Sequence, residues 1–182
     1  MKFNPKTVTL KNRKEVRIRT AEISDAENLL ATLQKYISDS AFIPKTSNEI
    51  IITVEQERDW ISSFIQKDNS LLLVAEFENE IIGNIDLTGN PRIMMQHTAI
   101  IGMGMLTDWR NVGLGTEFMK SSIDWAKENP MLELLLLQVY CENISAIYLY
   151  KKMGFKENGI VENYFKNGEE YHDNLMMSLV VK

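Results

Sequence analysis

A glycine-rich turn, Arg110 to Gly115, is the stretch whose residue types and spacing point most directly to chemistry. It lies between an apolar, strand-like run (99–106) and an amphipathic, helix-like run (116–128). Such a turn directs successive backbone N–H groups to one point, where the positive end of the helix dipole favours a phosphate. Glycines between a strand and a helix also serve as a plain tight connection, so the turn alone does not decide between the two.

Two further glycines, Gly102 and Gly104, lie in the strand-like run before the turn. Glycine weakens a strand and often marks a bulge or the close approach of a ligand. If residues 103–105 leave the neighbouring strand 134–139, unpaired backbone groups line a cleft in which an amide-bearing ligand can pair as an extra strand. The alternative is that both glycines relieve crowding against a neighbouring tryptophan.

The elements that must position these residues follow from hydrophobic periodicity. Strands are expected at 8–10, 16–19, 71–77, 81–87, 97–106, 134–139, 160–165 and 172–181. Helices are expected from Ser24, from Thr53, over 116–127 and over 143–153, with Glu27 and Gln56 completing capping boxes at the first two. Short turns imply an antiparallel meander, and a strand, a helix and a strand imply a parallel pair. We therefore predict an α/β fold with a mixed sheet (α+β) in a single domain, 1–182.

Composition excludes several classes of protein. A net charge of −5 argues against nucleic-acid binding, and the basic stretch 11–19 is interpreted as a solvent-exposed hairpin. The single Cys141, with His97 and His172 far apart, gives neither a disulfide nor a metal site, so no metal is expected and a reducing cytoplasm fits best. No apolar stretch is long enough to cross a membrane.

Two blocks of the sequence resemble the GNAT superfamily of acetyl-CoA-dependent N-acetyltransferases. Arg110 to Gly115 matches its R-x-x-G-x-G signature, and 137–155 resembles its V-x-x-x-N-x-x-A-x-x-L-Y-x-x-x-G-F block. The resemblance continues through the Gly159 to Asp173 pattern and so covers nearly the whole chain. It implies a mixed sheet of about six to seven strands, with helices on both faces and splayed central parallel strands. It also implies an enzyme that transfers an acetyl group from acetyl-CoA to a primary amine, by direct attack through a tetrahedral intermediate.

The resemblance also assigns site residues. Those implied in cofactor binding are Met103, Met105, Arg110, Asn111, Val112, Gly113, Leu114, Gly115, Thr116, Asn143 and Tyr150. The backbone N–H of Met105 is expected to polarise the acetyl carbonyl. The phenol of Tyr150 is expected to protonate the departing thiolate as a general acid, and Asn143 to cap its helix and bind the pantetheine arm.

The general base and the acceptor stay open at this stage. Asp86 or Glu142 is the candidate base, with His97 and a water relay as alternatives. The segments 38–52 and 159–173 are expected to line the pocket of an amine-bearing acceptor, either a small molecule, a polyamine or a peptide. A non-catalytic acyl-CoA-sensing module is the alternative function. The family often forms homodimers, and the sequence leaves the oligomeric state open.

Overall fold

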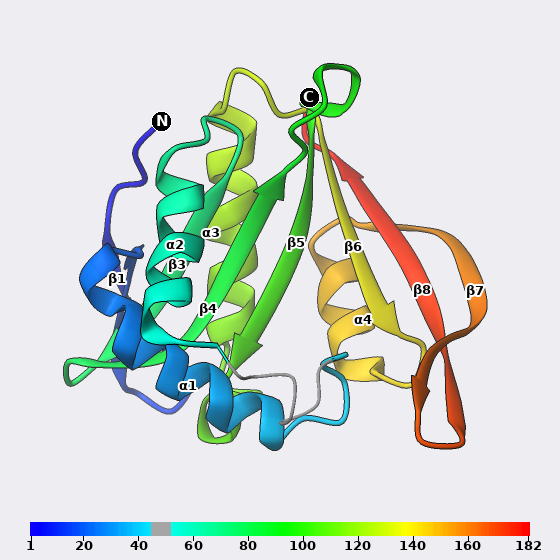
Figure 1. The fold of residues 1–182 in the computed structure, drawn as a ribbon, viewed down its shortest axis with the longest axis horizontal. Coiled ribbons are helices and arrows are strands. Elements are labelled where there is room, and N and C mark those ends of the chain that lie inside the picture. Colours follow the sequence, from blue (N-terminus) through cyan, green and yellow to red (C-terminus); the bar gives the residue numbers. More distant parts are fainter. Residues whose placement is uncertain (45–51) are drawn as a thin grey trace.

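A mixed sheet of eight strands is the centre of the computed structural model, which describes residues 1–44 and 52–182 (Figure 1). The strands are β1 (Lys6–Thr9), β2 (Glu15–Thr20), β3 (Leu71–Phe77), β4 (Glu80–Gly89), β5 (Thr98–Met105), β6 (Leu134–Tyr140), β7 (Lys156–Asn167) and β8 (Glu170–Val180). Their order is β1-β2-β3-β4-β5-β6-β8-β7, and only β5 and β6 pair in parallel. The expected mixed sheet is confirmed, with eight strands rather than about six to seven, because the first and last hairpins both join it.

Helices cover both faces of the sheet, as expected. In the described residues the α-helices are α1 (Ala26–Ser38), α2 (Val54–Ile65), α3 (Leu114–Glu128) and α4 (Ile144–Lys152). Figure 1 shows α1 and α2 in front of the sheet and α3 behind it. Side chains of α4 pack into the same core cluster as those of α3, which places both on the rear face.

The first two helices differ in how their N-termini are capped. Thr53 and Gln56 form the expected capping box at α2. The expected box of Ser24 and Glu27 is wrong, because α1 begins after a short 3₁₀ turn, Ile23–Asp25, and its N-cap is Asp25. The Asp25 carboxylate does not cap α1, since it accepts hydrogen bonds from Arg19 at 2.6 and 2.9 Å and from the amide of Glu22 at 2.7 Å.

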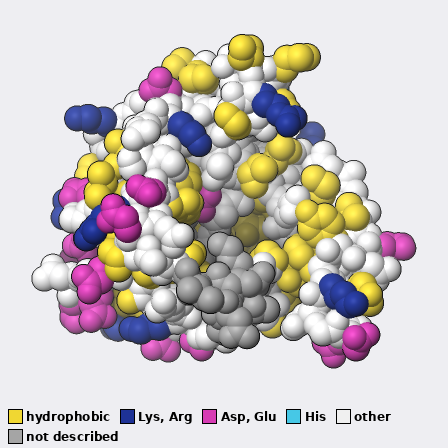
Figure 2. Space-filling view, viewed as in Figure 1, with side chains coloured by type: hydrophobic (Ala, Val, Ile, Leu, Met, Phe, Trp, Pro, Cys, Tyr) yellow, Lys and Arg dark blue, Asp and Glu magenta, His cyan; other side chains and the backbone are white. Residues whose placement is uncertain are grey.

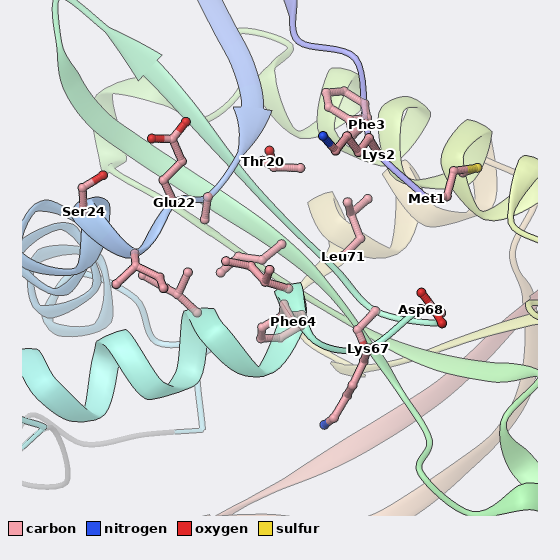
Figure 3. Close-up of a pocket in the computed structure, with 16 residues that line it drawn as sticks. Met1, Lys2, Phe3, Thr20, Glu22, Ser24, Phe64, Lys67, Asp68 and Leu71 are labelled. Carbon is pink, nitrogen blue, oxygen red and sulfur yellow. The ribbon is translucent and has the colours of Figure 1, made fainter.

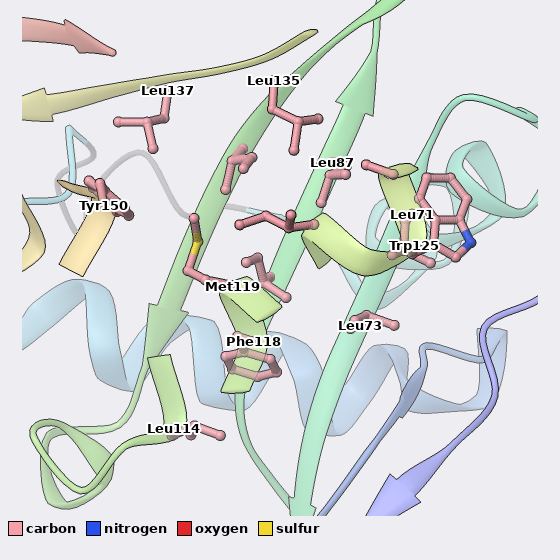
Figure 4. Close-up of a cluster of buried hydrophobic side chains, with 14 of the residues drawn as sticks. Leu71, Leu73, Leu87, Leu114, Phe118, Met119, Trp125, Leu135, Leu137 and Tyr150 are labelled. Atoms are coloured by element: carbon pink, nitrogen blue, oxygen red, sulfur yellow. The ribbon is translucent and has the colours of Figure 1, made fainter. Parts of the chain in front are cut away.

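The main core lies between the sheet and α3 (Figure 4). Leu114, Phe118 and Met119 of α3 are fully buried and pack against strand residues such as Leu73 and Leu135. Loss of a buried aromatic side chain such as that of Phe118 costs about 3–5 kcal/mol, so this cluster fixes α3 firmly on the sheet. The start of α3, which follows the glycine-rich turn, is therefore held in place by its own buried side chains.

The central parallel strands splay apart, as the resemblance implied. β5 and β6 pair only at Thr98–Leu134, Ala99–Leu135 and Ile100–Leu136. Beyond Ile100, β5 continues on β4 alone as far as Met105, and Figure 1 shows β5 and β6 diverging toward α4. The divergence opens the sheet next to the turn at Arg110.

The front face is only partly covered. Hydrophobic side chains gather on its right-hand half, where no described helix lies over β6 and β8 (Figure 2). Ile100 and Val180 on this half of the sheet are 49% and 68% exposed. No helix in the described part of the chain is long and apolar enough to cross a membrane.

Candidate active site

A cavity of about 470 Å³ lies at the splayed end of β5, between the starts of α3 and α4. The expected cofactor residues that line it are Met103, Met105, Arg110, Asn111, Gly113, Gly115, Thr116, Asn143 and Tyr150. Val112 and Leu114 do not line it; Leu114 is fully buried in the core, so only its backbone is available. Lining residues that the sequence did not assign to the cofactor include Lys11, Ser40, Gly104, Ser145, Tyr148, Leu149 and Lys152.

The glycine-rich turn leads into a helix start of the kind that can bind an anion. Asn111 and Gly113 have φ angles of 61° and 102°, in the left-handed region that glycine adopts readily. Gly113 is the N-cap of α3 and brings no side chain into the cap. Because the first amides of a helix have no intrahelical acceptor, those of Leu114, Gly115 and Thr116 are available to a ligand.

Gly115 keeps the cavity open between the two helices. A Cβ atom at this position would lie 3.2 Å from Leu149 of α4. It would also lie 3.5 and 3.6 Å from the terminal methyl groups of Met105 and Met103. A larger side chain at position 115 would therefore occupy the space through which a ligand reaches from the turn to β5.

The end of β5 turns its unpaired backbone edge toward this cavity. The amide of Leu106 donates to the Ile82 carbonyl of β4 at 3.0 Å. Since residues of an antiparallel strand alternate in the edge to which their N–H and C=O groups point, Met105 and Met103 present theirs to the open side. β6 does not pair with them there. No described strand therefore pairs with the N–H groups of Met103 and Met105 or with the Met103 carbonyl, and these groups are available to an extended ligand.

Arg110 bridges two backbone carbonyls. Its Nε donates to the Met105 oxygen at 3.4 Å, and its guanidinium donates to the Asp39 oxygen at 3.3 Å. This arrangement ties the end of β5 to the end of α1. Arg110 lines the cavity, and two of its five N–H donors are directed at these carbonyls.

α4 positions Asn143 and Tyr150 on the opposite wall. The Asn143 Oδ1 accepts from the amide of Ala146 at 3.2 Å, which confirms its role as N-cap. Tyr150 is 9% exposed, whereas Tyr148 is 71% exposed, as two residues on different sides of a helix should be. The Tyr150 hydroxyl makes no hydrogen bond to any described residue, and burial raises its pKa to about 12. Tyr150 therefore carries its proton throughout the neutral range.

The candidate bases lie outside the cavity. Asp86 of β4 accepts from the Thr88 hydroxyl at 2.9 Å, and a Cβ atom on Gly102 would lie 2.7 Å from its Oδ1. Glu142 is exposed and lies 3.0 Å from Nδ1 of His172, a hydrogen bond that lowers the pKa of this carboxyl. The structure thus brings the cofactor residues and Tyr150 together, but it does not bring either carboxylate to them.

His97 lies at the opposite end of β5 from the cavity. Its backbone carbonyl accepts from the amides of Glu133 and Leu134, next to the only paired part of β5 and β6. This position separates the imidazole from Tyr150 by the length of the strand.

The two expected acceptor segments meet at an aromatic cluster. Phe42, before α2, lies 5.9 Å from Tyr140 between ring centroids, and Tyr140 stacks on Phe165 of β7 at 3.8 Å. Phe42 and Ile43 also line the cavity. Residues 45–51 of the expected acceptor loop lie outside the described residues. No sequence signal singled out Tyr140, which directly follows the buried strand expected at 134–139.

A second cavity, of about 730 Å³, lies between the N-terminal segment and α2 (Figure 3). Met1, Phe3, Phe64 and Leu71 line it. It contains none of the residues expected to bind a cofactor or carry chemistry. The smaller cavity at β5 is therefore the candidate active site.

Comparison with known proteins agrees with this geometry. A family model described as an acetyltransferase (GNAT) domain matches residues 18–176. An N-alpha-acetyltransferase from Sulfurisphaera tokodaii is 25% identical and covers 88% of this chain and 92% of its own length. The L-amino acid N-acetyltransferase AaaT from Escherichia coli is 25% identical, and the match covers 91% of this chain and 98% of that protein.

A solved structure shares the fold. That of yncA from Salmonella typhimurium, with its cofactor acetyl-CoA, is 15% identical and has a TM-score of 0.82, covering 92% of this chain and 94% of that one. The family match extends from within β2 to within β8 and includes every residue that lines the cavity except Lys11. The chain therefore belongs to the GNAT acetyltransferase family and is an acetyl-transferring enzyme.

Proposed function

We propose that the chain takes an acetyl group from acetyl-CoA and transfers it directly to the α-amino group of a small molecule or a peptide. Support for the donor comes from the fit between the cavity and a long phosphorylated thioester. One end offers helix amides next to a left-handed glycine, and the other offers the unpaired edge of β5. Acetyl-CoA supplies an acetyl group on a thioester, which an unprotonated amine attacks.

The amides of Leu114, Gly115 and Thr116 would hold the pyrophosphate. The backbone groups of Met103 and the side chain of Asn143 would hold the pantetheine arm, which runs past Gly115 where a side chain would block it. The observation that carries this proposal is the bare helix start at Gly113, open to the same cavity as Tyr150.

Two groups would then act on the thioester. The Met105 N–H would donate to the acetyl oxygen and stabilise the charge that develops there as the amine adds. The sulfur would leave as a thiolate and take the proton of the Tyr150 hydroxyl, while the amine nitrogen loses its own proton to a base or to water. The high pKa of Tyr150 keeps that proton available. Fixing both reactants in one cleft would supply much of the rate.

The α-amine class is supported by the names of two relatives that cover most of this chain, one for L-amino acids and one for N-alpha groups. A screen of amines for thiol release tests it, with L-amino acids, short peptides, polyamines and aminoglycosides as acceptors. We expect release with the first two groups. Acetyl-CoA binding without release from any amine would instead indicate a sensing module.

The binding site is tested by Gly113→Glu, with Gly168→Glu as the matched control. Both glycines have positive φ, and a Cβ on Gly168 meets nothing within 4 Å in the turn between β7 and β8. Both variants therefore place a side chain at a position of positive φ and add the same charge. We expect calorimetry to give micromolar acetyl-CoA binding for the wild type and Gly168→Glu, and none for Gly113→Glu. Unchanged binding in Gly113→Glu would rule out the turn as the phosphate site.

A further inference from the structure

The basic stretch of the first hairpin does not remain uniformly in solvent. Arg19 forms ion pairs with Asp25 and Glu76. The Lys14 ammonium lies 4.8 and 5.0 Å from the ring centroids of Phe77 and Trp109. Lys11, at the start of the turn between β1 and β2, instead lines the 470 Å³ cavity. Of these three cations, only Lys11 reaches the candidate active site.

The backbone fixes Lys11 beside the glycine-rich turn. Its amide donates to the Val112 carbonyl at 2.9 Å, so the hairpin is hydrogen-bonded directly to the turn. The preceding Leu10 is 5% exposed in the main core, and its amide donates to the Lys14 carbonyl across the hairpin. A Cβ atom on Gly113 would lie 3.8 Å from the Cγ of Lys11. The aliphatic part of Lys11 therefore runs alongside the N-cap of α3.

The charge of Lys11 is available. No ion pair within the described residues involves Lys11, whereas Lys6 of the same hairpin pairs with Glu117 at 3.7 Å. Arg110, the cation that the signature supplies, directs two of its five N–H donors at backbone carbonyls. In a chain of net charge −5, a polyanionic ligand needs local positive charge to offset the overall repulsion.

We propose that Lys11 binds the pyrophosphate of the acetyl donor, reaching it from the first hairpin across Gly113. This inference rests on the proposed function, because it takes the cavity to be the donor site. A lysine suits the role, since its ammonium acts as a mobile point charge that meets phosphate oxygens without a fixed geometry. The hairpin and the start of α3 then hold the same phosphates from two sides.

Calorimetric titration of wild type, Lys11→Ala, Lys11→Arg and Arg17→Ala tests the proposal. Arg17 is exposed on β2 of the same hairpin, so Arg17→Ala removes the same charge outside the cavity. The ligands are CoA, dephospho-CoA, which lacks the 3′-phosphate, and pantetheine, which lacks all phosphates. Thermal unfolding of each variant checks that the fold is kept.

We expect Lys11→Ala to weaken CoA and dephospho-CoA by the same factor, about three- to fivefold at low salt, and to leave pantetheine unaffected. The factor should shrink as salt is added. Lys11→Arg and Arg17→Ala should stay within about twofold of wild type.

The possible failures are distinct. If the wild type binds no CoA, the proposed function fails and the Lys11 inference falls with it. If the wild type binds CoA but Lys11→Ala matches Arg17→Ala, only the Lys11 inference is overturned. If the effect of Lys11→Ala disappears with dephospho-CoA, the contact is with the 3′-phosphate and the pyrophosphate assignment is wrong.

Discussion

The ring of Tyr36 occupies the space that a side chain on Gly104 would need. A Cβ atom on Gly104 would lie 2.4 Å from both Cε2 and Cζ of Tyr36. The Tyr36 hydroxyl donates to Oδ1 of Asn84 at 2.9 Å, and Asn84 pairs with Gly104 across β4 and β5. α1 thus holds both strands at the point where β5 has left β6, next to Met105. Tyr36 positions the backbone that is proposed to polarise the acetyl group.

Gly104→Ala should therefore harm both stability and turnover. The added methyl cannot fit without moving a buried ring, and overpacking of this kind costs about 1–3 kcal/mol. Displacement of β5 would also misplace the Met105 amide, so kcat should fall while affinity for acetyl-CoA changes less. Urea denaturation gives the free energy of unfolding, and steady-state kinetics give kcat.

The double variant Gly104→Ala, Tyr36→Ala supplies the control. Removal of the ring makes room for the methyl. The double variant should therefore lose less stability than the sum of the losses in the two single variants. Tyr36→Phe keeps the ring and should not relieve Gly104→Ala. Full additivity in the double variant would show that the ring does not confine position 104.

The turn and the splayed strands were predictable because their signals are local. Gly113 and Gly115 stand at fixed spacing before an amphipathic helix, and the glycines of β5 mark a strand that pairs poorly. The crowding at Gly104 was also foreseen as an alternative, but it comes from Tyr36 rather than from a tryptophan. Nothing in the sequence near Gly104 identifies that partner, because α1 meets β5 only through the tertiary fold.

Sequence patterns could not show which segments, distant along the chain, lie together in the folded protein. Lys11 was assigned to a solvent-exposed hairpin because charge patterning cannot show which turn packs on which. The exposed apolar half of the sheet, with Ile100 and Val180, was missed for a similar reason. β6 begins with the continuous apolar run 134–137, which predicts burial on both faces, and the patch arises where β5, β6 and β8 lie side by side without a described helix over them.

The Arg19–Asp25 pair should make the free energy of unfolding depend on pH in the acidic range. Burial alone would raise the pKa of Asp25, but the hydrogen bonds from Arg19 and the Glu22 amide outweigh it and lower the pKa below its ordinary value. As pH falls, Asp25 therefore takes up a proton in the unfolded chain before it does so in the folded chain. The stabilisation is fully present above about pH 4 and is lost as pH falls through the lower pKa of the folded state. Asp25→Asn should cost about 1–3 kcal/mol at pH 7.

Urea denaturation of wild type and Asp25→Asn at pH 7 and pH 3 measures this dependence. The difference in free energy of unfolding between the two proteins should be smaller at pH 3. The exposed pair of Arg58 and Glu55 offers a control, because Glu55→Gln should change stability by less than about 1 kcal/mol at either pH. An Asp25→Asn deficit that is equal at both pH values would contradict the assignment.

Tyr150→Phe should lower kcat by about 10²-fold, because the thiolate would lose its proton donor. Its affinity for acetyl-CoA should change little, since the ring and its packing in the core are kept. Calorimetry and steady-state kinetics separate the two effects. A normal kcat in this variant would show that Tyr150 is only a packing residue.

The pH profile of kcat gives an independent check on Tyr150. With its pKa raised to about 12 by burial, the phenol stays protonated up to about pH 11, so it should cause no loss of activity between pH 7 and pH 10. Any alkaline fall in that range should persist in Tyr150→Phe. Its disappearance in the variant would mean that the phenol titrates far below this value.

Asp86, which lies outside the cavity, is the better candidate of the two carboxylates for a base that acts through water. It lies on β4 against Gly102 of the splayed strand, with its carboxylate oriented by the Thr88 hydroxyl. Glu142 is held by His172 at 3.0 Å, and its lowered pKa makes it a weaker base. Asp86→Asn should therefore lower kcat/KM by about 10²-fold, whereas Glu142→Gln should stay within about twofold. If both variants keep wild-type activity, neither carboxylate is the base and water alone carries the proton from the amine.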